Sequence, residues 1–380
     1  MAEEAIANDE VPGLVAIVAR KGKIVYHKAF GLADVASGAP METDHIFRIA
    51  SQTKAITSVA VMMLWEEGRF GLDDPISNYI PEFKDPKILD TYDEATGSYT
   101  SIPAKKEITI RQLLTHSSGL GYGMIDSNKA IKTIYKQAGI VDAWSIEPDL
   151  LADNIKRLAK LPLVFEPGEK YHYSLGIDVL GYLIEIVSGM SFDTFLQERL
   201  FKPLGMADTH FYLPEEKADR LVTPHLDKDG EWVKYRGVPS YYDADYPIKG
   251  AKTYFSGGAG LSSTAYDYAT FLQMVLNDGE LNGVRFLSRT TVDTMNAIQI
   301  DKGGEISHGL AFGINNEKSL AKGGLGSVGS VSWGGYFNSQ YFADPDEQVL
   351  AVLLKQTRKT INRDSTRDKY RRLVLQAIDD

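Results

Sequence analysis

Ser51 and Lys54 stand three positions apart at the start of SQTKAITSVAVMMLWEEG, a segment with the apolar spacing of a helix. Side chains three residues apart on a helix share one face, so the hydroxyl and the amine can meet. A helix N-terminus also favours developing negative charge, and the backbone N–H of Ser51 would be free to donate to an oxyanion. The spacing therefore indicates a serine nucleophile that is activated by a lysine.

The commoner alternatives for covalent or metal chemistry find no support in the sequence. The chain has no cysteine, which excludes a thiol nucleophile and a Cys-ligated metal or cluster. It contains neither G-x-S-x-G nor H-E-x-x-H, and its seven histidines lack the spacing of metal ligands. We therefore expect an oxygen or nitrogen nucleophile, no metal and no cofactor.

Two further motif matches are interpreted as structural. Ser319-Leu320-Ala321-Lys322 also fits S-x-x-K, but it runs into Gly323-Gly324 with no helix to organise it, so we assign Ser319 and Lys322 to a loop. A G-x-G-x-x-G run from Gly324 to Gly329 leads into SVSWGGYF, which has the composition of a strand. Without a following helix, this run argues against a dinucleotide site.

Lysine-activated serine chemistry normally needs a second proton carrier, because a protonated lysine is a poor base at neutral pH. Tyr173, in the segment EPGEKYHYSLG, is our candidate for this role. With 20 tyrosines in the chain, a Tyr–Ser pair is nonspecific by itself. The assignment of Tyr173 therefore depends on the order of motifs along the whole chain.

The elements that must position these residues follow from the periodicity. Two β-rich stretches around Lys21-Gly22 predict a hairpin, and two more joined at Asp344-Pro345-Asp346 predict a second one. Helices are predicted from about Ser51 to Gly68, in STAYDYATFLQMVLNDG, in DKYRRLVLQAI, and over 110–115, 150–161, 177–188 and 192–200. We expect an α+β fold with a sheet domain from residues 1–70 and 255–380, a mainly helical domain from 71–254, and the active site in the cleft between them.

The charge balance limits the partners. The chain has 41 basic and 51 acidic residues, a net charge of −10, and no basic patch suited to nucleic acid. The basic stretch from Lys355 to Arg372 is interrupted by acids, and we expect a solvated helix face there. No apolar run is long enough to span a bilayer, and MAEEAIANDEVPG lacks the apolar core of a signal peptide. We expect a cytoplasmic location, with earlier removal of a leader as the alternative.

Several segments in order resemble one known family over almost the whole chain. They are FRIASQTKAITSVAVMMLWEEGRFGLDDPISNYIPEF, ITIRQLLTHSSGL, PGEKYHYSLGIDVLGYLIEIVSG, PLGMADT, SGGAGLSSTAYDYATFLQMVLNDGEL and HGLAFGI. Together they resemble the serine β-lactamase-like superfamily, most nearly the family VIII carboxylesterases. These esterases are similar in fold to class C β-lactamases and D-alanyl-D-alanine peptidases. The resemblance implies a β-lactamase/transpeptidase-like fold.

Carried over by position, the resemblance implies Ser51 as the nucleophile and Lys54 with Tyr173 as the coupled general base and acid. Which of the two takes the proton of Ser51 stays open. Trp333-Gly334-Gly335 stands in place of the superfamily's K-T-G strand, and the backbone N–H of Tyr336 would be the second oxyanion donor after that of Ser51.

Two departures from the lactamase pattern concern the substrate. Leu175 stands where β-lactamases and peptidases typically have an asparagine that binds the substrate amide, and Trp333 replaces a lysine that would attract a substrate carboxylate. Both changes are similar to those in family VIII esterases and favour neutral esters. An aromatic segment contributes possible pocket residues, Tyr241, Tyr242 and Tyr254.

The leading hypothesis is a serine hydrolase that cleaves short-chain esters of small molecules through an acyl-serine intermediate. A β-lactamase, a D-amino-acid peptidase or amidase, and an acyltransferase would use the same scaffold. A non-catalytic penicillin-binding-like module is the alternative from another class, and the intact set Ser51, Lys54 and Tyr173 argues against it. The sequence leaves the oligomeric state open.

Overall fold

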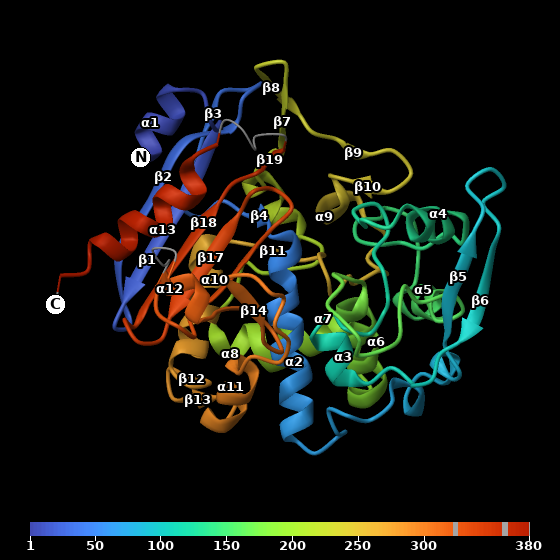
Figure 1. Ribbon diagram of the computed structural model, residues 1–380. Helices are drawn as coiled ribbons and strands as arrows, with labels where there is room; N and C mark the ends of the chain where they lie inside the picture. The colour runs from blue at the N-terminus through green and yellow to red at the C-terminus, as the bar shows by residue number, and fades with distance from the viewer. Residues whose placement is uncertain (322–325, 359–363, 380) are drawn as a thin grey trace.

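The main sheet has eight antiparallel strands contributed by both ends of the chain. The computed structural model describes residues 1–321, 326–358 and 364–379. Strands from the N-terminal and C-terminal regions lie side by side, blue beside red in Figure 1. Their spatial order is β14 (Ile306–His308), β15 (Gly313–Asn315), β16 (Val331–Gly334), β17 (Gln340–Asp344), β18 (Val349–Leu354), β1 (Gly13–Arg20), β2 (Lys23–Asp34) and β3 (Ala39–Pro40).

Both predicted hairpins are confirmed. β1 pairs with β2 through a turn at Lys21-Gly22, where both residues have positive φ. β17 pairs with β18, with Asp344 opposite Val349. The central pairing joins the two hairpins, since Val15 lies opposite Leu354 and Arg20 opposite Val349. A single sheet is thus assembled from segments more than 300 residues apart.

The sheet buries both of its faces. Alternate residues of β1 and β18, such as Ile17 and Val352, belong to the main core on one face. Their neighbours Leu14 and Leu353 pack on the other face with Tyr370 of α13 (Thr366–Gln376). Figure 1 shows α1 (Ala2–Ala7) and α13 on that outer face, away from the helices of the middle region. Burial on both faces accounts for the continuous apolar runs in these strands.

The predicted helix after Ser51 lies at the centre of the molecule. A 3₁₀ turn, η1 (Ala50–Gln52), leads into α2 (Thr53–Glu66), and the chain leaves the helix at Gly68 with φ 73°. Every residue of α2 from Thr53 to Leu64 is buried. α2 packs against α6 (Gly176–Ser188) on one side, so it is enclosed rather than amphipathic.

The middle region contains the predicted helices but more strand than expected. Its helices are α3 (Ile110–Leu114), α4 (Lys129–Gln137), α5 (Leu151–Leu158), α6, α7 (Phe192–Leu196), a π-helical turn η4 (Gln197–Phe201), α8 (Lys202–Leu204) and α9 (Tyr246–Lys249). Its strands are β5 (Lys87–Tyr92), β6 (Tyr99–Pro103), β7 (His225–Lys228), β8 (Glu231–Lys234), β9 (Gly237–Val238) and β10 (Tyr242–Asp243). β7 pairs with β19 (Thr357–Arg358) from the C-terminal part. The division into two domains stays a prediction.

The remaining elements include α10 (Ala265–Leu276), a predicted helix of 12 residues that packs against β1 and β18, and otherwise mostly short segments. The others are β4 (Phe47–Arg48), η2 (Ile76–Asn78), η3 (Pro81–Phe83), η5 (Glu215–Arg220), β11 (Ser262–Ser263), β12 (Glu280–Leu281), β13 (Val284–Arg285), α11 (Arg289–Asn296) and α12 (Glu317–Ala321). Among the described residues no single helix is long and apolar enough to cross a membrane. One pair bent by 80°, Gly176–Ser188 with Phe192–Leu204, passes by combined length and composition alone.

Two sequence interpretations need correction. Ser319 lies in α12 rather than in a loop, and its hydroxyl donates to the carbonyl of Asn316 at 2.7 Å. Its motif partner Lys322 and the first two residues of the G-x-G-x-x-G run lie outside the described residues. The stretch that begins at Lys355 is not uniformly solvated, because Lys355 is fully buried and pairs with Asp364. The burial of Lys355 comes from the packing of the folded chain around it, which the local sequence does not indicate.

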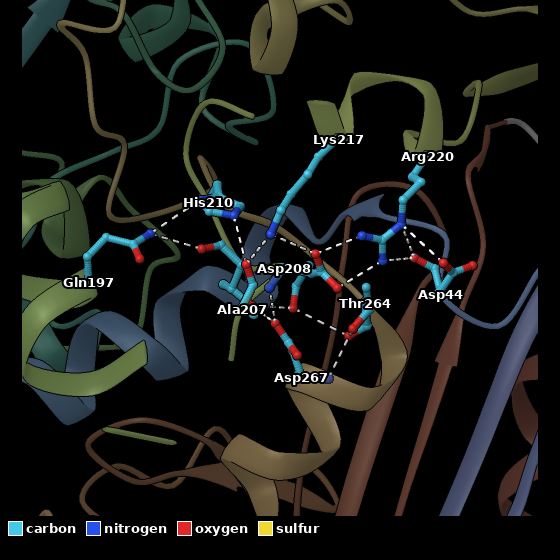
Figure 2. Close-up of polar contacts among 11 residues, drawn as sticks. Asp44, Gln197, Ala207, Asp208, His210, Lys217, Arg220, Thr264 and Asp267 are labelled. Carbon is cyan, nitrogen blue, oxygen red and sulfur yellow. Dashed lines mark hydrogen bonds and ion pairs between the residues drawn. The ribbon is translucent and has the colours of Figure 1, made fainter. Parts of the chain in front are cut away.

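A polar cluster ties the 207–220 segment to the start of α10 (Figure 2). Asp208 accepts hydrogen bonds from Arg220 at 2.8 Å, and the ammonium of Lys217 lies 2.9 Å away. Asp267 in α10 accepts from the backbone N–H of Asp208 at 2.8 Å, and its own N–H donates to the capping hydroxyl of Thr264. These contacts hold the 207–220 segment, in which His210 pairs with Ser262 of β11. β11 in turn pairs with β4, which ends just before the turn that carries Ser51.

Candidate active site

The structure places the hydroxyls of Ser51 and Tyr173 in direct contact. The phenol of Tyr173 donates to Oγ of Ser51 at 2.7 Å. Ser51 lies on the 3₁₀ turn η1, and the preceding Ala50 has φ 48°, a left-handed conformation that few non-glycine residues adopt. Such strain is held in place by the surrounding packing and is frequent at functional sites. Ala50 itself is fully buried.

Lys54 lies one turn further along and beneath the two hydroxyls. Its side chain is buried, and Nζ donates to the carbonyl of Gly258 at 2.7 Å. The ammonium also lies 4.5 Å from the centroid of the Tyr173 ring, where its charge meets the negative face of the aromatic system. Within the described chain, Tyr173 provides the one hydrogen bond to the hydroxyl of Ser51. The three residues predicted to act together are therefore brought together.

Glycines allow the loop before α10 to approach this lysine. A Cβ at Gly257 would lie 2.6 Å from the carbonyl oxygen of Ile177, and one at Gly258 would collide with the carboxylate of Asp178. Neither position tolerates a side chain, so the carbonyl of Gly258 can reach Lys54. The contact with Lys54 gives the reason for a glycine at position 258.

Asp178 is an acidic group near Lys54 that sequence reasoning missed. It is fully buried, and its Oδ1 accepts from the hydroxyl of Ser256 at 2.7 Å and from the N–H of Gly258 at 3.3 Å. Burial raises the pKa of Asp178, and the positive charge of Lys54 opposes that shift. Asp178 stands five residues after Tyr173 in the motif, but nothing in its spacing indicated that it would face Lys54.

Tyr122 is a second tyrosine at the site that the sequence did not reveal. Its ring stacks on that of Tyr173 with centroids 5.3 Å apart, and its hydroxyl lies 3.4 Å from Nζ of Lys54. Burial raises the pKa of Tyr122 well above its ordinary value, so this phenol stays protonated. It follows directly on the THSSGLG stretch, and Asp126 fixes it by accepting its backbone N–H.

The substrate strand predicted from the K-T-G position borders the nucleophile. Trp333 and Gly334 end β16, and the Trp333 ring lies 6.0 Å from that of Tyr173. A Cβ at Gly335 would lie 2.7 Å from the carbonyl oxygen of Ile49, so the strand end passes close to the residues before Ser51. In the described structure the backbone N–H of Tyr336 donates to no protein acceptor. The arrangement is compatible with backbone N–H groups of Ser51 and Tyr336 that bind an oxyanion, and this role stays a prediction.

Two buried histidines beside the site are uncharged. His116 packs 4.8 Å from the Tyr173 ring and 5.5 Å from the ring of His308. Burial lowers the pKa of His116 well below its usual value and that of His308 to about 3. Neither ring therefore carries a proton near neutral pH, which fits proton transfer by Lys54 and Tyr173 without histidine.

The three tyrosines proposed for a pocket separate into two groups. Tyr241 and Tyr242 line a hollow of about 610 Å³ together with Trp144. Tyr254 differs from the expectation, because its ring is buried in the main core and its hydroxyl donates to the carbonyl of Val141 at 2.9 Å. The Tyr254 ring therefore lies inside the protein rather than on a pocket wall. No local pattern in the sequence predicts its contact with Val141.

Trp144 centres an aromatic cluster that reaches from this hollow to the nucleophile turn. Its ring stacks on Phe337 and lies 5.3 Å from the ring of Tyr336. The same cluster buries Ala50, the residue before the nucleophile. The indole N–H of Trp144 donates to the carbonyl of Ala259 at 2.8 Å. Tyr336, the residue that follows Trp333-Gly334-Gly335, is thus held in place by aromatic packing. Among the residues that the structure describes, no three acidic or histidine side chains lie close enough together to hold a metal ion.

The sheet, the central helix with Ser51 and Lys54, and the glycine-ended strand define a protein of the β-lactamase/transpeptidase-like fold. A family model described as Beta-lactamase matches residues 1–376, and the chain belongs to this family.

The relatives of this chain include esterases. Esterase EstB of Burkholderia gladioli is 33% identical over 93% of this chain and 88% of its own. Lovastatin esterase of Penicillium rubens is 28% identical over 87% of this chain and 85% of its own. Among solved structures, "EstCE1, a hydrolase with promiscuous acyltransferase activity" superposes with a TM-score of 0.83 and 27% identity, covering 97% of this chain and 94% of that one.

Proposed function

We propose that the protein is a serine carboxylesterase that cleaves short-chain esters through an acyl-serine intermediate. The hydrogen bond between Tyr173 and Ser51, with the ammonium of Lys54 over the Tyr173 ring, carries this proposal. Similarity to Esterase EstB and to EstCE1 over nearly the whole chain supports ester hydrolysis on this scaffold. The geometry alone would serve any acyl transfer from an ester or amide.

In acylation, Oγ of Ser51 attacks the ester carbonyl carbon and its proton passes to the phenolic oxygen of Tyr173. The cycle starts from the deprotonated form of Tyr173, with the Lys54 ammonium over the ring as its counter-ion. In that form the hydrogen bond that the phenol donates to Oγ at rest runs the other way, from the hydroxyl of Ser51 to the phenolate oxygen. The tetrahedral oxyanion receives hydrogen bonds from the backbone N–H groups of Ser51 and Tyr336. When the carbon–oxygen bond breaks, Tyr173 donates the proton to the leaving alcohol, and the acyl group stays on Ser51.

In deacylation, water takes the place of the alcohol. Tyr173 accepts a proton as the water oxygen attacks the acyl carbon, and it returns that proton to Oγ of Ser51 as the acid departs. Each half-reaction leaves Tyr173 and Lys54 in their starting states. This cycle assigns the proton-accepting role to Tyr173, because Tyr173 and not Lys54 is in hydrogen-bonding contact with Ser51.

Leu175 supports esters over amides. It occupies the position of the lactamase asparagine, and its side chain is fully buried in the core. The site therefore has no amide side chain at this position to bind a substrate amide group. EstCE1 is a hydrolase with promiscuous acyltransferase activity, so acyl transfer to an alcohol is the second candidate, in which an alcohol replaces water in deacylation.

The test is a panel of p-nitrophenyl esters from acetate to decanoate, with nitrocefin and a D-alanine amide, on wild type and Ser51→Ala. We expect kcat/KM to be highest for the short acyl chains and activity to vanish in Ser51→Ala while the circular dichroism spectrum is unchanged. Faster turnover of nitrocefin than of p-nitrophenyl butyrate would favour the β-lactamase alternative. Butyl ester formation on addition of butanol would favour the transferase.

A further inference from the structure

A cavity with an excess of positive charge lies against the substrate strand. It has a volume of about 610 Å³ and is walled by the end of β16, by β17 and by the start of α13. Four basic and two acidic side chains line it: Lys302, Lys355, Arg367, Arg371, Asp364 and Asp368. We call it the basic cavity. A local excess of cations in a chain of net charge −10 calls for an explanation.

Both acids of the basic cavity are engaged by cations already present. Lys355 forms a buried ion pair with Asp364, and its ammonium also donates to the hydroxyl of Thr366 at 2.8 Å. Nε of Arg367 lies 4.0 Å from Asp368. These two pairs leave Lys302 and Arg371 without an acidic partner within ion-pair distance in the described part of the chain.

The two unpaired cations are not ordinary surface groups. Lys302 is partly buried, and its ammonium lies 4.7 Å from the centroid of the Tyr171 ring and 5.4 Å from that of Trp333. Arg371 is 9% exposed, and its Nε and Nη2 have no hydrogen-bond partner. Arg371 lies over the ring of Phe342, and the negative charges of Asp344 and Asp368 lie near enough to act on it. Among the described residues Lys302 has no such acidic neighbour, and burial lowers its pKa. Removing this ammonium from water without a counter-ion is unfavourable, so the cavity beside Lys302 is suited to an anion.

The basic cavity adjoins the catalytic groups through Trp333. Trp333 lines the cavity, carries the ammonium of Lys302 near its ring, and lies 6.0 Å from the ring of Tyr173. Tyr173 in turn bonds Ser51. Trp333 is thus the one ring between Lys302 and Tyr173 in this series of contacts, which puts the ammonium within reach of a substrate that binds across Trp333. The indole occupies the position where K-T-G proteins carry a lysine, and Lys302 brings a cation back from a different segment.

We propose that the preferred substrates are esters that carry a carboxylate, which binds in the basic cavity against Lys302. Arg371 adds positive potential from the far wall of the cavity. This inference rests on the proposed esterase function and changes the expectation of neutral esters drawn from Trp333 alone. A carboxylate forms charge-assisted hydrogen bonds with an ammonium, and the partial burial of Lys302 limits screening by water.

The kinetic test compares two esters with the same acyl group, phenyl butyrate and 4-(butyryloxy)benzoate, on wild type and Lys302→Met. Methionine keeps much of the side-chain length and removes the charge. We expect kcat/KM for the carboxylate ester to fall about tenfold and that for phenyl butyrate to change by less than about twofold. In wild type, the preference for the carboxylate ester over phenyl butyrate should shrink as salt is added. The control is Lys318→Met, because that exposed lysine lies 3.4 Å from Asp301 and outside the cavity.

An equal loss on both esters in Lys302→Met would overturn the proposal, because it would show a structural role. The proposal would also be overturned if Lys318→Met lowered kcat/KM for the carboxylate ester as much as Lys302→Met does. Calorimetric binding of benzoate against benzamide gives a readout that needs no turnover. Wild type should bind benzoate more tightly, and Lys302→Met should lose that preference; the same preference in both proteins would contradict the proposal. Inactivity of wild type on phenyl butyrate would instead count against the esterase function.

Discussion

Replacing Tyr173 by Phe removes one oxygen atom from the centre of the proposed mechanism. In the structure that oxygen is the hydrogen-bond partner of Ser51 Oγ at 2.7 Å, while the ring keeps its stacking on Tyr122 and its contact with the ammonium of Lys54. The substitution therefore deletes the proton carrier and leaves the packing intact. Stability should fall by only about 1 kcal/mol, the usual net value of a single neutral hydrogen bond.

The effect on the reaction should be much larger than the effect on folding. A positioned general acid or base contributes about 10²- to 10⁴-fold, which corresponds to about 3 to 5 kcal/mol in the activation free energy. We expect Tyr173→Phe to lower kcat/KM for p-nitrophenyl butyrate by at least about a hundredfold. Initial rates at several pH values measure this loss, and urea unfolding measures the stability.

Tyr122→Phe is the matched control, because it makes the same chemical change in the neighbouring ring. The Tyr122 hydroxyl lies 3.4 Å from Lys54 and forms no bond to Ser51. Its loss should cost less than about tenfold. Comparable losses in the two variants would refute the distinction between them, and a loss below about tenfold in Tyr173→Phe would refute the proton-carrier role itself.

Three further predictions concern the strand, the buried arginine and the acid in α10. Gly335→Ala should lower kcat at least about tenfold and stability by about 1 to 3 kcal/mol, since its Cβ would lie 2.7 Å from the Ile49 oxygen; unchanged kinetics would contradict this. Arg48→Met should lower the free energy of unfolding by about 3 kcal/mol in urea titrations, because two buried carbonyls lose the guanidinium that binds them at 2.6 and 2.8 Å. Burial raises the pKa of Asp267 to about 6 from 3.8, so the folded state holds its proton longer and stability falls as pH rises from about 4 to about 6. Asp267→Asn should flatten that fall, and an unchanged slope would exclude Asp267 as its source.

The sequence predicted best those features that depend on local order. The apolar run after Ser51 and the turn residues Lys21-Gly22 determine a helix and a hairpin through neighbouring residues, and both occur as predicted. The approach of Tyr173 to Ser51 and Lys54 followed from motif order rather than from any local pattern. Helix spacing placed Lys54 on the face of Ser51, but only the fold brings Tyr173 from 122 positions away.

The features that were missed depend on contacts between distant segments. Lys355 reads as a surface lysine in sequence, yet its burial follows from the position of Asp364 beside β18. Asp178 belongs to a motif that was recognised, but its approach to Lys54 depends on α6 packing against α2. Tyr122 follows a recognised motif, and its position depends on its contacts with Asp126 and Tyr173. Lys302 lies in a polar segment, and its position over Trp333 depends on the pairing of β14, β15 and β16. Periodicity carries no information on such contacts.

The central claim is that Ser51 Oγ carries the acyl group. Intact-protein mass spectrometry after rapid acid quenching of the protein with p-nitrophenyl butyrate tests it most directly, followed by peptide mapping. The account predicts a butyryl mass increment on the peptide that contains Ser51 in wild type, its accumulation where deacylation is slow, and its absence in Ser51→Ala. An increment on another residue, or one that persists in Ser51→Ala together with turnover, would contradict the account.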